Sequence, residues 1–133
     1  MFGYIINRYI GPLMAKEHQF DDDLLENLPL PTASFFVLFA LAEEEKHGYR
    51  IMQDIRELSG GTVSVGPATL YTTIKKLSDQ SLISETSISP ADRRRTYALT
   101  PAGKRLLGAE FHRQQQLLDL ARRKKLLRIG EQK

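Results

Sequence analysis

Residues 47–77 read HGYRIMQDIRELSGGTVSVGPATLYTTIKKL, and this stretch decides the fold. Apolar side chains recur in it at the i, i+4, i+7 spacing of a helix face, once in each half. They are Ile51, Ile55 and Leu58, followed by Leu70, Ile74 and Leu77. Gly60-Gly61 is typical of a helix end, and Pro67 is typical of a first helical turn. The stretch therefore predicts two helices, over residues 49–58 and 67–80, joined by a turn and a short β-branched link.

A more apolar segment precedes this pair of helices. Eight apolar residues run without a break over 35–42, and four of them share one helical face. The four are Phe35, Leu38, Phe39 and Ala42. Thr32 is a suitable N-cap, so the segment predicts a buried helix over residues 33–45 at the centre of the core. Further upstream, residues 20–28 predict a short helix that ends before Pro29.

A hairpin and a long helix follow the pair. Residues 82–88 and 96–99 have strand character, and the turn between them carries three consecutive arginines, Arg93, Arg94 and Arg95. Thr100 and Pro101 then predict the start of a helix of about 28 residues. The order of elements predicts a mainly α (α+β) protein, a winged helix-turn-helix with a long C-terminal dimerisation helix.

This order also suggests a division of the chain. We expect an N-terminal extension with a short helix over residues 1–29 and a winged-helix domain over 30–100. A dimerisation helix over 101–128 and a tail over 129–133 would follow. Met14 is a candidate start, which would make residues 1–13 an upstream extension.

Composition excludes several classes of protein. The 133 residues include no Cys, which excludes disulfides, thiolate metal sites and thiol nucleophiles. Neither a secretory signal nor a run of about 20 apolar residues is readable, so we expect a cytoplasmic protein without a membrane span. His18, His47 and His112 lie on separate elements without ligand spacing, so no metal and no cofactor is expected. No catalytic triad, carboxylate pair or phosphate loop is present, so we expect no enzyme.

The helix over 67–80 has a second face that is suited to DNA. The residues opposite the apolar stripe are small, polar or basic, and helices that enter a major groove use such residues for bases and phosphates. They are Pro67, Ala68, Thr69, Tyr71, Thr72, Thr73, Lys75 and Lys76. An ordinary solvated face would have a similar composition. Tyr71 is compatible both with the core and with a contact to DNA.

Charge is distributed unevenly along the chain. Residues 14–46 carry eight acids against two bases, whereas residues 104–133 carry nine bases against three acids. The three arginines of the hairpin turn would reach phosphates or a narrow minor groove of DNA. The alternative is that they only make the turn more soluble. The polar helix face and the basic turn together favour double-stranded DNA as the partner.

These features together resemble the PadR-type winged-helix transcriptional regulators, over roughly residues 30–128. The matching segments are His47-Gly48-Tyr49, Gly66-Pro67-Ala68-Thr69-Leu70-Tyr71, Ile74-Lys75-Lys76-Leu77, Leu82-Ile83 and Arg95-Thr96-Tyr97-Ala98-Leu99-Thr100-Pro101-Ala102-Gly103. The resemblance implies a homodimeric repressor that binds a palindromic operator and that a small hydrophobic or phenolic effector could release. A single C-terminal helix is similar to that of the shorter subgroup, in which this helix forms the dimer.

The sequence departs from the family at several points. Ser81 stands where the family usually has Gly, and the hairpin turn lacks the commoner Gly-Arg-Pro form. No Trp is present, so stacking of a flat drug between tryptophans is not implied. The first 30 residues are not explained by the resemblance.

The C-terminal helix predicts the dimer interface. Apolar residues follow a 4-3-4-3 spacing, with one polar residue that would set the register. They are Leu107, Phe111, Gln114, Leu118 and Ala121. A helix of this length would span about 42 Å, so part of its stripe needs a partner. The alternative is a solvated helix that packs on its own domain. An effector pocket would lie at the dimer interface, near Phe111.

Three functions remain at this point. The sequence favours a DNA-binding regulator. A winged-helix module that binds another protein without specific DNA binding is the alternative, and it predicts weak, salt-insensitive binding of DNA. An enzyme is the least favoured of the three. We expect His47 to be a turn residue, and Tyr49 and Tyr97 to serve mainly in packing.

Overall fold

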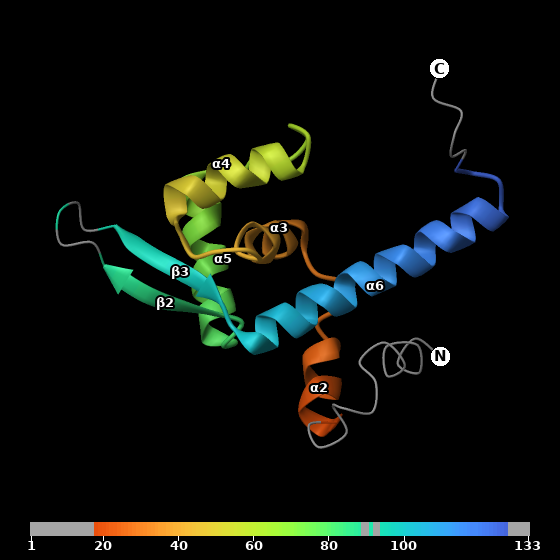
Figure 1. Ribbon diagram of the computed structural model, residues 1–133, viewed down its shortest axis with the longest axis horizontal. Coiled ribbons are helices and arrows are strands. Elements are labelled where there is room, and N and C mark those ends of the chain that lie inside the picture. Colours follow the sequence, from red (N-terminus) through yellow and green to blue (C-terminus); the bar gives the residue numbers. More distant parts are fainter. Residues whose placement is uncertain (1–17, 89–90, 92–93, 128–133) are drawn as a thin grey trace. The chain divides into compact units, whose positions relative to one another are not determined.

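The computed structural model describes residues 18–88, 91 and 94–127 (Figure 1). The chain divides into two compact units. One comprises Pro29–Leu107. The other comprises Met1–Leu28 and Gly108–Lys133, of which residues 18–28 and 108–127 are described. None of the helices in the described ranges is both long and apolar enough to cross a membrane.

Three helices form the core of the larger unit. They are α3 (Thr32–Ala40), α4 (Gly48–Leu58) and α5 (Pro67–Asp79), and α3 packs against both of the others. The apolar stripes predicted for the last two are confirmed, because Ile51, Ile55, Leu70, Ile74 and Leu77 are all buried. Leu58 is the exception: it is 42% exposed at the end of α4, so its predicted place in the stripe is wrong.

Helix α3 differs from its prediction in start, length and phase. Pro31 is the N-cap and makes no side-chain cap bond, so Thr32 is the first helical residue and not the cap. The helix ends at Ala40, five residues earlier than predicted. Its buried face contains Val37 and Leu38, whereas Ala42 is exposed beyond its end. A helix that is apolar on every side has no polar face, so its orientation in the core cannot be predicted from the sequence.

The described residues form a three-stranded antiparallel sheet in the order β1-β3-β2. Strands β2 (Ile83–Ile88) and β3 (Arg95–Leu99) form the predicted hairpin, here called the wing, which extends beyond the helices of this unit in Figure 1. Strand β1 (Lys46–His47) was not predicted and pairs with Thr96 and Tyr97. Because His47 belongs to this strand and caps α4, its prediction as a turn residue is wrong.

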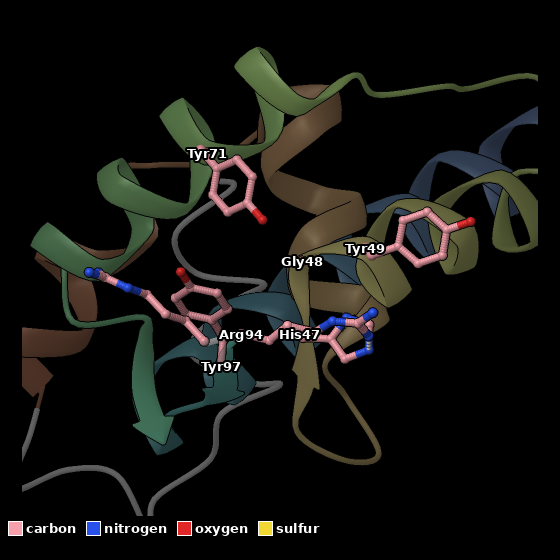
Figure 2. A pocket seen from close by; sticks show the side chains of 7 residues that line it. His47, Gly48, Tyr49, Tyr71, Arg94 and Tyr97 are labelled. Carbon is pink, nitrogen blue, oxygen red and sulfur yellow. Dashed lines mark hydrogen bonds between the residues drawn. The ribbon is translucent and has the colours of Figure 1, made fainter. Parts of the chain in front are cut away.

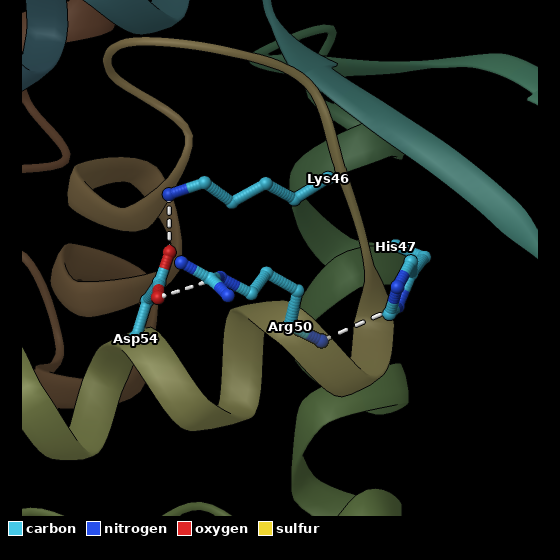
Figure 3. Close-up of polar contacts among 4 residues, drawn as sticks. All are labelled: Lys46, His47, Arg50 and Asp54. Atoms are coloured by element: carbon cyan, nitrogen blue, oxygen red, sulfur yellow. Dashed lines mark hydrogen bonds and ion pairs between the residues drawn. The ribbon is translucent and has the colours of Figure 1, made fainter.

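An ion-pair cluster around the buried Asp54 fixes the junction of β1 and α4 (Figure 3). Asp54 is 6% exposed and pairs with the ammonium group of Lys46 and, at 3.1 Å, with Nε of Arg50. His47 Nδ1 accepts a hydrogen bond of 3.3 Å from the backbone N–H of Arg50, which makes His47 the N-cap of α4. The cluster ties the strand to the first two turns of the helix, so the His47 ring has a defined position.

Helix α5 ends in a turn that requires a left-handed residue. The N–H of Leu82 donates to the carbonyl of Leu77 at 2.9 Å, and the N–H of Ser81 donates to that of Ser78 at 2.9 Å. This is the Schellman pattern, and Ser81 has the positive φ of 60° that it demands. A Gly at this position would adopt that conformation without strain.

We expect Ser81→Gly to stabilise the protein by about 0.5–1 kcal/mol, because it removes the strain of a left-handed non-glycine residue. Urea unfolding of wild type and variant would measure the difference. Gly60 occupies the equivalent position after α4 with a φ of 64°, so Gly60→Ser provides the matched reverse change and should destabilise. A Ser81→Gly variant that is no more stable than wild type would show that the turn stores no strain.

Helix α6 (Pro101–Arg123) starts as predicted and ends earlier than predicted. Thr100 Oγ1 accepts a bond of 3.0 Å from the N–H of Gly103, so the N-cap is confirmed. The same hydroxyl donates to the carbonyl of Ser81 at 2.7 Å. The helix ends five residues before the predicted residue 128, which lies outside the described residues, and Lys125 follows with a left-handed φ of 61°.

The described part of the second unit contains α2 (His18–Leu25) and the later turns of α6. Helix α2 starts two residues before its predicted start and ends three residues before its predicted end. On α6, Glu110 is only 2% exposed and receives two bonds from Arg113, of 2.6 Å and 2.9 Å. This hydrogen-bonded pairing raises the pKa of Arg113 above its ordinary value.

Candidate nucleic-acid interface

One face of α5 is exposed, and most of the residues predicted for DNA contact lie on it. The exposed ones are Pro67, Ala68, Thr69, Tyr71, Thr72, Lys75 and Lys76. Thr73 is buried, with 8% of its surface exposed. It lies three residues after Leu70 and four before Leu77, so the helical period turns it toward the core. Its prediction as a DNA-contacting residue is therefore wrong.

The start of α5 presents backbone donors. Gly66 is the N-cap without a side-chain bond, and Leu70 is the first residue whose N–H reaches a carbonyl of the helix, that of Gly66 at 2.9 Å. The N–H groups of Ala68 and Thr69 precede it and have no acceptor within the helix. Both side chains are small and exposed. A phosphate could approach these donors closely.

The two lysines of this face lie more than two turns into the helix. Lys75 Nζ is 3.1 Å from a carboxylate oxygen of Asp79, and both side chains are largely exposed. Such a surface pair contributes less than about 1 kcal/mol, so Lys75 could exchange Asp79 for a phosphate at little cost. Lys76 is exposed beside it.

A polar pocket lies between the start of α4, helix α5 and strand β3 (Figure 2). Its volume is about 460 Å³. The described lining consists of His47, Gly48, Tyr49, Tyr71, Arg94, Arg95 and Tyr97. The pocket adjoins both the wing and the exposed face of α5, because residues of β3 and Tyr71 line it.

Tyr71 and Tyr97 meet at this pocket. Tyr71 is 49% exposed, and its hydroxyl lies above Gly48, which decides between the two positions that the sequence allowed: the ring is not in the core. Tyr97 is 6% exposed and was correctly predicted to face inward. Burial raises the pKa of Tyr97, and Glu85 and Tyr71 raise it further while Arg95 lowers it. Its hydroxyl therefore stays protonated at neutral pH and can donate a hydrogen bond.

Two of the three wing arginines are described. Arg95 Nη1 is 3.3 Å from a carboxylate oxygen of Glu85 on the neighbouring strand. Arg94 is exposed, and its Nη1 lies 3.1 Å from Nε2 of His47. Arg93 lies outside the described residues. The wing thus brings cationic groups to the pocket, close to the N-terminus of α4.

The residues predicted for a dimer interface differ in how far they are exposed. Leu107 is 5% exposed and buried within the single chain, so its assignment to an interface is wrong. Phe111 and Leu118 are 36% and 44% exposed, and Leu117 and Leu120 on the same helix are exposed to 52% and 42%. Gln114 and Ala121 are half-buried. The exposed side chains of Leu117, Leu118 and Leu120 on α6 therefore remain available to a partner.

The contribution of α4 to the site was missed by sequence reasoning. His47 and Tyr49 were assigned to a turn and to packing, yet both line the pocket. Tyr49 is 59% exposed, and its ring stacks on His47 with centroids 6.5 Å apart. The His47-Gly48-Tyr49 segment could have indicated this contribution, because a Gly between two aromatic polar side chains at a helix start can form a polar surface.

Comparison with known proteins places the chain among transcriptional regulators. Residues 37–109, more than half of the chain, match the family described as the transcriptional regulator PadR-like family. The chain is 39% identical over 72 residues to the transcriptional regulator Rv3488 of Mycobacterium tuberculosis, which covers 53% of this chain and 64% of that protein. It is 38% identical over 80 residues to an uncharacterised 37.1 kDa protein of transposon Tn4556 from Streptomyces fradiae, covering 60% of this chain.

The chain thus spans 22% and 64% of the lengths of these two relatives. Among solved structures, it resembles Bacillus subtilis PadR in complex with operator DNA, with a TM-score of 0.52 and 26% identity. That match covers 58% of this chain and 46% of the other. The predicted winged helix-turn-helix architecture is confirmed by the family match and by this likeness.

Proposed function

Because the chain belongs to the PadR-like family of transcriptional regulators, we propose that it binds double-stranded DNA sequence-specifically, as a homodimeric repressor on a palindromic operator. Members of this family are regulators and not enzymes. The observation that carries the proposal is the exposed polar face of α5 next to the arginines of the wing, within one compact unit.

The α5 face supports recognition in the major groove. A helix that enters this groove needs small residues at its N-terminus and donors along its exposed side. Ala68 and Thr69 meet the first need, and Thr72, Lys75 and Lys76 meet the second. The wing arginines would contact phosphates or the adjacent minor groove.

The exposed apolar side chains of α6 support the homodimer. The 23-residue helix is about 35 Å long, and four large apolar residues in its middle are exposed. A second copy of this helix, in two-fold symmetry, would cover the same residues on both chains. The two α5 helices would then meet half-sites one helical turn, about 34 Å, or a multiple apart, which predicts a palindrome.

Repression follows from occupancy, because a dimer seated on an operator blocks access to the DNA. A small hydrophobic or phenolic effector that binds at the dimer interface near Phe111 would relieve it by changing the half-site spacing. This effector and its pocket remain predictions.

Replacing Lys75 and Lys76 together by Ala should weaken DNA binding and flatten its salt dependence. Each phosphate that a lysine no longer neutralises reduces the slope of log K against log salt by about 0.9, so a change of up to about 1.8 per chain is expected. Fluorescence anisotropy with a labelled duplex over a series of salt concentrations would measure it.

The matched control is Lys104→Ala, which removes an exposed lysine from the first turns of α6. This variant should keep the wild-type slope. If the α5 double variant also kept the wild-type affinity and slope, the exposed face of α5 would not be part of a DNA interface.

A further inference from the structure

Gly48 is a buried residue at the start of α4, and its lack of a side chain makes room for Tyr71. A Cβ at residue 48 would lie 2.5 Å from the hydroxyl oxygen of Tyr71, 3.0 Å from Cζ of the same ring and 3.3 Å from Cδ2 of Leu70. The first distance is about 1 Å shorter than an ordinary van der Waals contact. A residue with a side chain would therefore displace either the start of α4 or the Tyr71 ring.

The start of α4 is the fixed side of this contact. Strand β1 immediately precedes the helix and pairs with β3. Lys46 of that strand and Arg50 of the first helical turn both pair with the carboxylate of the buried Asp54. Gly48 lies between these two cations in the sequence, so its backbone is held on both sides. A side chain at residue 48 would therefore move the Tyr71 ring and not the backbone beneath it.

Tyr71 is the movable side of the contact, and it belongs to the helix that we propose to enter the major groove. Its side chain is 49% exposed, and Figure 2 shows its hydroxyl directed toward Gly48. Thr69 and Thr72, which are exposed, lie close to it along α5. Tyr97 of the wing strand β3 lines the same pocket as Tyr71 and Gly48. The start of α4, helix α5 and the wing thus meet where this ring lies.

The placement of α5 beside the wing matters more for base recognition than for general attraction to DNA. Binding groups have to be held within about 0.5 Å of their productive positions. Contacts to phosphates are made in part by long lysine and arginine side chains, and they carry no sequence information. A displaced Tyr71 ring should therefore reduce sequence-specific binding and leave non-specific binding nearly unchanged.

We propose that Gly48 is a positioning residue of the DNA interface. The room that it leaves allows the Tyr71 ring to lie against the start of α4, and this contact sets how α5 is presented beside the wing. The assignment rests on the proposed DNA-binding function. It adds Gly48, a residue that touches no DNA, to the determinants of sequence specificity, and it makes Tyr71 a spacer between helices.

The test uses the full chain and two labelled DNA probes in fluorescence anisotropy. One probe is a duplex of about 30 base pairs that wild type enriches from a random-sequence library, and the other is the unselected library. Gly48→Ala should weaken binding of the selected duplex about tenfold, a loss comparable to that from one mismatched base pair. Its affinity for the unselected library should stay within about twofold of wild type, with the same salt slope, because no cation is removed.

Tyr71→Phe is the compensating change, because it removes the atom that a methyl group at residue 48 would meet most closely. This variant alone should bind the selected duplex as wild type does, since the ring keeps its place. Adding Gly48→Ala to Tyr71→Phe should weaken binding only about threefold, because non-additivity is expected where two side chains are in contact. The closest remaining atom of the ring would be Cζ, at 3.0 Å.

Tyr49→Phe is the matched control for this rescue. It removes a hydroxyl from another exposed tyrosine of the pocket, and Figure 2 shows that this hydroxyl points away from Gly48. Gly48→Ala combined with Tyr49→Phe should remain about tenfold weaker than wild type, because the two changes are independent.

Tyr71→Ala keeps the proposal testable if Gly48→Ala does not fold, which circular dichroism would show. It removes the whole ring of a half-exposed residue, so the protein should fold. Without the spacer, it should lose affinity for the selected duplex and keep its affinity for the unselected library.

Three results would overturn the proposal. A loss in Tyr71→Phe alone that equals the loss in Gly48→Ala would show that the hydroxyl itself contacts DNA. Wild-type binding of the selected duplex by folded Gly48→Ala or Tyr71→Ala would show that the contact does not govern specificity. An equal loss for both probes would show a general loss of the interface. In each case wild type still enriches a duplex, so the proposed function stands; if wild type enriches none, the proposed function itself fails.

Discussion

Replacing Leu118 by Glu should convert the protein to a monomer and lower its affinity for an operator by about a hundredfold or more. Leu118 is 44% exposed among the apolar side chains of α6, and a carboxylate placed there would have to be buried without a partner in a two-fold interface. A monomer binds only one half-site. It loses the gain in affinity, about 10²–10⁴-fold, that a dimer obtains because binding one half-site holds its second subunit near the other. Sedimentation velocity and anisotropy measure the two effects.

Leu58→Glu is the matched control for this change. Leu58 is 42% exposed at the end of α4, so the same substitution there alters the charge by the same amount at nearly equal exposure. This variant should remain a dimer. A dimer that survives Leu118→Glu as well would place the dimer interface outside the middle of α6.

Replacing Gly103 by Ala should destabilise the protein by about 3 kcal/mol or more, because the new methyl group has no room. It would lie 2.1 Å from the carbonyl oxygen of Leu82 and 2.8 Å from Cδ1 of Leu99. That carbonyl accepts the N–H of Thr100 at 3.1 Å, so it cannot move without breaking a bond at the start of α6. Denaturant unfolding measures the loss of stability.

Gly66→Ala serves as the comparison. A Cβ at this position would have no heavy atom within 4 Å beyond its chain neighbours. The substitution should therefore destabilise the protein only through the weaker N-capping tendency of Ala, by about 1 kcal/mol. Equal stabilities of the two variants would show that the close approach of α6 to Leu82 is not rigid.

Much of the fold was predictable because several helices carry their apolar residues on one face only and have clear ends. Helices α4 and α5 each carry an apolar stripe and a clear end, and the hairpin is marked by its turn. The Thr100 cap followed from a side chain that bonds within its own turn. Such features depend on neighbours in the sequence, so the sequence contains them.

The failures concern features that depend on tertiary contacts. Strand β1 has two residues, too few for an alternating pattern, and exists because β3 pairs with it. Thr73 and Leu107 were assigned to surfaces, although Thr73 lies toward the core side of α5 and Leu107 is buried. The pocket joins residues that are up to 50 positions apart, so no single segment could indicate it.

The most direct test of the central claim is a selection of DNA from the source genome. The purified protein is incubated with genomic fragments and excess competitor DNA at about 150–200 mM salt, where non-specific binding is weak, and the retained fragments are sequenced. Our account predicts a few enriched sites that share a palindrome. A folded dimer that enriches no site would contradict sequence-specific DNA binding and favour a winged-helix module that binds another protein.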